Sequence, residues 1–469
     1  MKFRAIIATL CYFAFACSAT AQSPTEPFSN ASELAPTMYK GPTFMLSHDY
    51  PASAPTPAMP WRAAINNGII TPANASAYVE ALKKSIGNDM RVLLQDYAHW
   101  DAAKLGWYNE PWLGSLREPI HGMYHGAKEL DKSLFQASGL KRPITTYVLT
   151  YYDKTAAQTL NHIWGTSAMT PNVTKETTQY AEGAIVIKAA FVTAGPDLWP
   201  PMKGALSWPL YITLNATSTQ KHLTPVMTNT YLMQFDVIVK DSVSAPKTGW
   251  VFSTLVYDSR IKSPDIWDKM VVLGAQWGND PQANNPAILR PVLLENWNNP
   301  KAPAYGGETL GWGQRLSGPN DGAMNDIAYA TGSKPTPQKY VKNAKDSSCM
   351  SCHSSAQWNL NNQKQGMDSF LLPLSTQLPA MPPGCTDVKN PKCNFLNSPA
   401  PGSDLWMKWF KNRKGDEPMD PGSVAADFDM VLTFKSLPQW FKATQSAGEH
   451  DLLRRDYRGK RGLQVEVAK

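Results

Sequence analysis

The stretch Tyr231-Leu-Met-Gln-Phe-Asp-Val-Ile-Val239 is the clearest secondary-structure signal in the chain. In a β-strand, successive side chains point to opposite faces, so every second residue shares a face. One face of this stretch is apolar and consists of Tyr231, Met233, Phe235, Val237 and Val239. Because Gln234 and Asp236 fall on the other face, the pattern predicts a strand with one buried face.

Runs of similar composition lie on both sides of this strand. They are rich in β-branched and aromatic residues and are separated by glycine and proline, which is typical of strands joined by turns. The runs cover residues 145–152, 184–192, 210–214 and 250–257. The sequence contains no GxGxxG, P-loop or GxSxG motif. We therefore expect an antiparallel sheet or sandwich and not a parallel α/β domain.

A helix is expected before the strands. It should begin at Thr71-Pro72, because threonine is a good N-cap and proline suits the first helical position. Apolar residues then keep helical spacing on either side of a weak point at Gly87-Asn88. Residues 66–300 are therefore predicted to form a body of the α+β class, a β-rich sheet or sandwich with an N-terminal helix. The proline-rich residues 22–65 are predicted to be a lead-in rather than a packed element.

A second feature, Ser348-Cys349-Met350-Ser351-Cys352-His353, has the form CxxCH. Two thiols at this spacing can each form a thioether to one vinyl group of a haem, and the next histidine becomes an axial ligand of the iron. A zinc ribbon would need a second CxxC or an HxxxH downstream, and a thioredoxin-type pair would need a βαβ context; neither is present. The motif predicts one covalent haem c on Cys349 and Cys352, with His353 as the proximal ligand.

Residues 1–21 have the features of a cleaved secretory signal peptide. A basic start precedes an apolar run over residues 5–16 and the small-x-small sequence Ala19-Thr20-Ala21. A lipoprotein signal ending at Cys17 is the alternative, but it lacks the usual aliphatic residue three positions earlier. The run is too short to span a bilayer, so we expect no transmembrane segment in the mature chain. Because c-type haem is attached outside an energy-transducing membrane, leader and motif together predict a periplasmic protein.

The net charge of the chain limits the kinds of binding partner, and the remaining cysteines indicate the redox state of its compartment. The formal net charge is +7, falling to about +5 without the leader, and the scattered basic residues do not favour nucleic acid as a partner. A basic face for a periplasmic redox protein and an ordinary solvated surface are both open. Cys385 and Cys393 are predicted to form a disulfide in an oxidising compartment, worth roughly 2.5 kcal/mol in the chain-entropy model; two unpaired thiols are the alternative.

Residues 301–469 differ in character from the preceding body. They are rich in loops, glycine and proline, with helices expected over residues 404–410 and 425–441. We predict that they form a helical, loop-rich c-type haem segment at the C-terminal end.

Several further motifs accompany CxxCH along the chain. They are Arg117-Glu118-Pro119-Ile120-His121-Gly122, Thr248-Gly249-Trp250-Val251-Phe252, Gln276-Trp277-Gly278-Asn279-Asp280-Pro281 and Arg315-Leu316-Ser317-Gly318-Pro319. This succession resembles a family of exported bacterial proteins that are usually labelled only as cytochrome c family proteins. The resemblance covers about residues 90–440 and implies one haem with His353 as axial ligand, but no established reaction. The last third of the chain is long enough for a small cytochrome c domain, but small cytochromes c carry the motif near their start, so their fold cannot simply be transferred to this segment.

The ligand on the other side of the iron decides between functions. Methionine closes the iron and favours electron transfer, and Met419 and Met381 are the candidates. An open iron would instead allow peroxidase or oxygenase chemistry on a small-molecule substrate, for which Arg117 and His121 are candidate distal groups. His121 and His125 could also meet one metal ion if they were helical, but Gly122 and Gly126 favour a loop.

Single-electron transfer by a periplasmic monohaem cytochrome is therefore the predicted function, with a periplasmic redox protein as partner. A haem enzyme with its iron under the β-rich body is the first alternative. A haem-based redox or gas sensor is the second. No catalytic residue can be assigned from the sequence.

Overall fold

The computed structural model describes residues 26–126, 130, 132–213, 224–285, 287–288, 292–308, 324–329, 339–345, 349–360 and 402–446. The predicted signal peptide, Cys17, Met381 and the Cys385–Cys393 pair lie outside these residues. Predictions about them therefore stay predictions.

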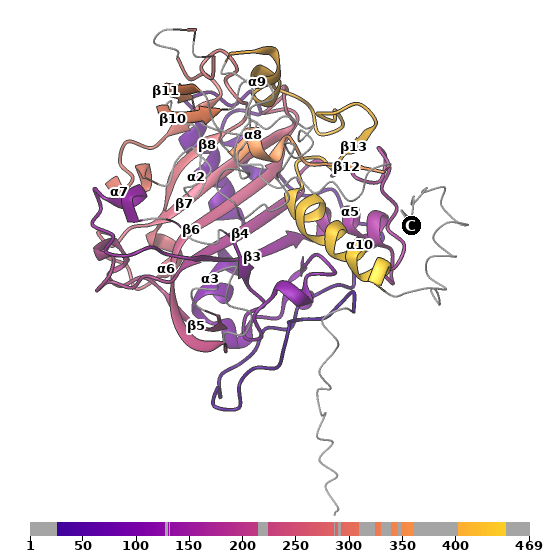
Figure 1. The fold of residues 1–469 in the computed structure, drawn as a ribbon, viewed down its shortest axis with the longest axis vertical. Coiled ribbons are helices and arrows are strands. Elements are labelled where there is room, and N and C mark those ends of the chain that lie inside the picture. Colours follow the sequence, from indigo (N-terminus) through magenta and orange to yellow (C-terminus); the bar gives the residue numbers. More distant parts are fainter. Residues whose placement is uncertain are drawn as a thin grey trace, which may run out of the picture.

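Nine strands form one antiparallel sheet within the described part of the chain (Figure 1). The order is β1-β3-β4-β6-β7-β8-β9, with β2 paired to β3 and β5 to the first part of β6. The strands are β1 (Trp107–Tyr108), β2 (Tyr124–His125), β3 (Thr146–Asp153), β4 (Ile185–Val192), β5 (Ser207–Ile212), β6 (Val226–Lys240), β7 (Trp250–Tyr257), β8 (Met270–Gln276) and β9 (Asn296–Asn298). The antiparallel sheet is confirmed, and it takes the form of one sheet and not a sandwich.

Each of the five runs predicted to be strands lies on one of the strands β3 to β7. The largest difference is at the start of β6, which begins at Val226 instead of Tyr231. This extension has no apolar alternation, and it is extended because it pairs with β5 from Ile212↔Val226 to Ser207↔Tyr231. Two smaller antiparallel pairs are β10 (Met324–Tyr329) with β11 (Lys339–Lys345) and β12 (Gln357–Asn359) with β13 (Ser423–Ala425).

Two helices, α2 (Ala75–Ser85) and α3 (Gly87–Gln95), cover one face of the sheet. Their buried residues pack with the apolar face of β6 in one core, and the break between them falls at Ile86, one residue before the predicted weak point at Gly87-Asn88. The helix begins later than predicted because the Asn74 side chain accepts from the backbone N–H of Thr71 at 2.7 Å and closes a turn there.

Part of the described lead-in is packed, contrary to our expectation, whereas other side chains such as Leu34 and Met38 are exposed. It contains the short helix α1 (Pro60–Ala63), and the side chain of Trp61 is buried. The Trp61 indole donates to Asp241 Oδ2 at 3.2 Å, and Arg62 forms an ion pair with the same carboxylate. Paired polar groups and one large apolar side chain therefore fix this segment to the body.

The opposite face of the sheet is covered by C-terminal elements and α5 (Lys154–Trp164) (Figure 1). The C-terminal elements are α8 (Cys349–His353), the π-helical turn η5 (Leu432–Ser436) and α10 (Leu437–Ser446). Their side chains share a second core with Ile238 and Phe252 of the sheet. These C-terminal elements are therefore packed on the body by a common core.

The prediction that β6 has only one buried face is wrong, because this covering buries the other face as well. Gln234 is fully buried and Asp236 is 4 % exposed. Two polar contacts hold these side chains, since Gln234 Nε2 donates to Asp236 at 2.8 Å and Lys188 forms an ion pair with Asp236 at 2.6 Å. Polar residues on this face thus indicate a covered polar site and not a solvent-exposed surface.

The helix predicted over residues 425–441 begins later, after a turn. Asp427 and Phe428 have φ angles of 41° and 69°, which an α-helix cannot contain. Asp429 then caps the following helical segment, because its Oδ1 accepts from the backbone N–H of Leu432 at 3.0 Å. The helix predicted over residues 404–410 is confirmed as α9 (Asp404–Trp409).

The remaining helices are short. They are α4 (Ala102–Leu105), α6 (Ile266–Lys269), α7 (Ala304–Gly307) and the 3₁₀ turns η1 (Tyr97–His99), η2 (Gly114–Leu116), η3 (Lys132–Phe135) and η4 (Pro200–Met202). Among the residues described, none of the helices has the length and apolarity needed to cross a bilayer.

Candidate functional site

The three CxxCH residues lie together on α8, which packs against the sheet. Cys349 and Cys352 are both buried. The backbone N–H of Met350 donates to Gln276 Oε1 at 2.9 Å, which ties α8 to β8 at the centre of the motif. The motif therefore has a fixed position over the sheet.

A hollow lies between α8 and the sheet. It encloses about 640 Å³, including space open to solvent, and Cys349 and His353 are among its lining residues. Strands β3, β4, β6 and β7 supply its floor, and the segment from Asp427 to Val431 supplies a further wall.

The hydrogen bond of His353 fixes the state of its imidazole. His353 Nδ1 lies 2.8 Å from the backbone carbonyl oxygen of Phe428. A carbonyl can only accept, so Nδ1 carries the proton and donates, which leaves Nε2 with its lone pair. Burial lowers the pKa of His353 to about 4, although the bond to Phe428 acts in the other direction. A neutral imidazole with an unprotonated Nε2 is the form that binds iron.

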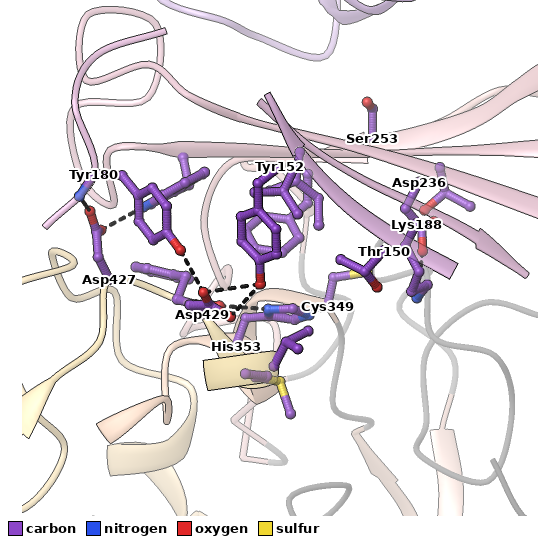
Figure 2. A pocket seen from close by; sticks show the side chains of 18 residues that line it. Thr150, Tyr152, Tyr180, Lys188, Asp236, Ser253, Cys349, His353, Asp427 and Asp429 are labelled. Atoms are coloured by element: carbon purple, nitrogen blue, oxygen red, sulfur yellow. Dashed lines mark hydrogen bonds and ion pairs between the residues drawn. The ribbon is translucent and has the colours of Figure 1, made fainter. Parts of the chain in front are cut away.

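An acidic cluster forms one side of the hollow (Figure 2). The Asp429 carboxylate accepts from the Tyr152 hydroxyl at 3.1 Å and from the Tyr180 hydroxyl at 2.5 Å. Burial raises the pKa of Asp429, and these donors offset part of the effect. Burial likewise raises the pKa of Glu110, and the charge of Asp429 adds to this.

An ion pair occupies the other side of the hollow, where Figure 2 shows Lys188 and Asp236 beyond Cys349. The two residues are direct cross-strand partners on β4 and β6, and Lys188 Nζ lies 2.6 Å from Asp236 Oδ2. Burial acts to lower the pKa of Lys188, but the charge and hydrogen bond of Asp236 outweigh it, so the pKa lies above its ordinary value. The floor of the hollow thus carries a charged pair held by the register of the sheet.

The two predicted distal residues are not among those lining the hollow. His121 belongs to the helix-covered side, where its ring stacks on Trp208 at 4.5 Å between centroids. Neither of its ring nitrogens has a hydrogen-bond partner in the described part of the chain, and burial lowers its pKa to about 3. Arg117 is buried and donates to the backbone carbonyl of Glu110 at 3.0 Å.

The histidines of the HxxxH sequence do not meet. His125 Nε2 lies 3.2 Å from the Tyr147 hydroxyl, while His121 packs among aromatic rings. Over the ranges that the structure describes, no group of three or more His, Cys, Asp or Glu side chains is placed to hold a bare metal ion.

Met419, one of the two predicted sixth ligands, is buried but is not part of the lining of the hollow. Met430 is part of that lining, although we did not single it out in the sequence. Phe428 has no side-chain signal in the sequence, because its contribution is a backbone carbonyl. A detectable signal did exist for Lys188 and Asp236, because opposite charges on neighbouring predicted strands can pair across a covered face.

The residues around the hollow fit a covalently attached haem. Cys349 and His353, whose Nε2 is available, line the hollow together with the apolar side chains of Val186 and Ile238. Cys352 is buried on the same helix but is not among the lining residues. The fold and site define an α+β protein in which a CxxCH helix covers one face of a single antiparallel sheet. The chain matches no family model, no curated protein and no solved structure.

Proposed function

We propose that this chain is an exported monohaem c-type cytochrome that transfers single electrons. Cys349 and Cys352 would hold the haem through thioethers, and His353 Nε2 would be the proximal ligand. The observation that carries the proposal is the 2.8 Å contact of His353 Nδ1 with the Phe428 carbonyl, which leaves Nε2 unprotonated beside two buried thiols.

The bound haem supplies an iron that alternates between the ferrous and ferric states. The residues of the chain orient the proximal ligand, surround the haem and retain it. The Phe428 carbonyl orients the imidazole of His353 and raises its basicity. The apolar residues of the hollow would pack against the haem, and the covalent attachment would prevent loss of the cofactor when the iron changes charge.

The proposed location is the periplasm, and the proposed partner is another periplasmic redox protein. Support comes from the leader-like features of residues 1–21 and from the need to attach c-type haem outside the energy-transducing membrane. The mild positive charge of the chain suits an acidic partner without requiring one.

The test uses the exported, haem-loaded protein. We expect reversible one-electron reduction and a visible spectrum of the reduced form that does not change when carbon monoxide is added, because an electron-transfer haem would have a strong sixth ligand that closes the iron. A rapid spectral shift with carbon monoxide would show an open iron and would contradict electron transfer as the main function.

A haem enzyme is the second candidate, and one feature of the hollow favours it. Met419 lies outside the lining, whereas Asp429 and its two tyrosine donors lie within it and could exchange protons with a bound substrate. Turnover of peroxide with a reducing dye, lost in Asp429→Asn, would support this alternative. An Asp429→Asn variant with unchanged turnover would count against it.

A further inference from the structure

The carbonyl that holds His353 belongs to an unusual turn. The backbone N–H of Asp429 donates to the Ala426 carbonyl at 2.7 Å, which closes a four-residue turn with Asp427 and Phe428 at its centre. Both central residues have positive φ, at 41° and 69°. Aspartate tolerates this conformation, but phenylalanine rarely adopts it, so contacts outside the turn must hold it.

Those contacts converge on the Asp427 carboxylate, which is completely buried. Lys240 Nζ lies 2.7 and 2.8 Å from its two oxygens, and the Trp250 indole donates at 2.6 Å. The backbone N–H of Tyr180 donates to Oδ2 at 2.8 Å. Lys240 is the last residue of β6 and Trp250 is the first residue of β7. The sheet therefore holds the turn in place through its contacts with the Asp427 side chain.

The Phe428 side chain also holds the turn against the sheet, through packing. Its ring lies 6.0 Å from the ring of Phe252 and 6.4 Å from that of Trp250, measured between centroids. The Phe252 ring also lies 4.7 Å from the imidazole of His353. The chain of contacts therefore runs from the sheet to Asp427, through the Phe428 carbonyl, to His353 Nδ1.

We infer that Asp427 is a positioning residue that fixes the proximal histidine of the haem from the sheet, an inference that rests on the function proposed above. The body would then act on the iron and not merely carry the haem. A firm Nδ1–H···O=C bond increases the electron donation of the imidazole and so favours the ferric state. Loosening the turn weakens this bond and shifts the equilibrium toward the ferrous state.

The test compares midpoint potentials of haem-loaded full-length variants. In Asp427→Ala the equilibrium constant for reduction should rise about tenfold, equal to an upward shift of about 59 mV for one electron. Asp427→Asn should give a smaller rise, because asparagine tolerates positive φ and still offers an acceptor to the Trp250 indole. If the alanine variant does not fold, the asparagine variant provides the test.

Asp241→Ala is the matched control. Asp241 is also fully buried and accepts from a tryptophan indole, an arginine and a backbone N–H, but it binds the helix-covered side of the body. Its loss should destabilise the fold without moving the potential. An unchanged midpoint potential in both Asp427 variants, or an equal shift in Asp241→Ala, would overturn the inference about Asp427 but would leave the proposed function standing. Wild-type protein without covalent haem would instead overturn the proposed function.

Discussion

Neutralising Asp236 should destabilise the protein through the charge it leaves on Lys188. The change Asp236→Asn keeps the shape of the side chain and an acceptor for Gln234 Nε2, so it isolates the loss of charge. Breaking a buried ion pair by removing one partner costs about 3–5 kcal/mol. The Lys188 side chain is 28 % exposed and Asp236 only 5 %. Because solvent reaches part of the lysine, we expect about 2 kcal/mol.

The assay is urea unfolding of the haem-loaded chain, with stability read from midpoint and slope. The double variant Lys188→Met/Asp236→Asn removes both charges and should recover most of the loss, giving a coupling energy of about 1–2 kcal/mol. The surface pair Lys175–Asp416, with side chains 65 % and 41 % exposed, is the control, and Lys175→Met should cost less than about 0.5 kcal/mol. Equal losses for Asp236→Asn and Lys175→Met, or a double variant as unstable as the summed singles, would refute this reasoning.

Three further predictions concern other buried groups. Glu118→Gln should remove a decline in stability between pH 4.5 and 7, on the order of 3 kcal/mol, as followed by urea unfolding across pH. Gly415→Ala should cost about 1–3 kcal/mol and raise the midpoint potential, because a Cβ there would overlap Asp427 Oδ1; an unchanged potential would contradict this. His121→Phe should raise thermal stability by about 1 kcal/mol, since it removes two unsatisfied ring nitrogens and keeps the stack on Trp208; a lower melting temperature would contradict it.

The sign of the Glu118 effect follows from proton binding. Burial raises the pKa of Glu118 from 4.5 to about 7, although four backbone N–H groups act to lower it. Between these values the folded chain holds a proton that the unfolded chain releases, so stability is full below pH 4.5 and falls as pH rises through 7. A Glu118 whose donors keep its pKa below 4.5 would give the opposite slope.

The sheet was predictable because its signal is local. The alternation over Tyr231 to Val239 fixes both the strand and its core face. The burial of the opposite face of this strand could not be predicted in the same way. Gln234 and Asp236 are buried because elements more than a hundred residues later in the chain cover them, and strand periodicity contains no information about that covering.

The candidate site also has one part with a local sequence signal and one part without. CxxCH is recognisable because the chemistry needs particular side chains at fixed spacing. The carbonyl that orients His353 lies 75 residues away and has no side-chain signature. Asp427 has a conformational preference compatible with its turn, whereas Phe428 does not, so its positive φ became visible only in three dimensions.

The central claim is tested most directly by the intact mass of the exported protein after denaturation. We predict a mass above that of the mature polypeptide by one haem, retained after acidic organic extraction. In the double variant Cys349→Ala/Cys352→Ala this excess should be absent, because both thioether sites are removed. A wild-type chain with the mass of the bare polypeptide, purified from cells that attach haem to a control cytochrome, would contradict the account.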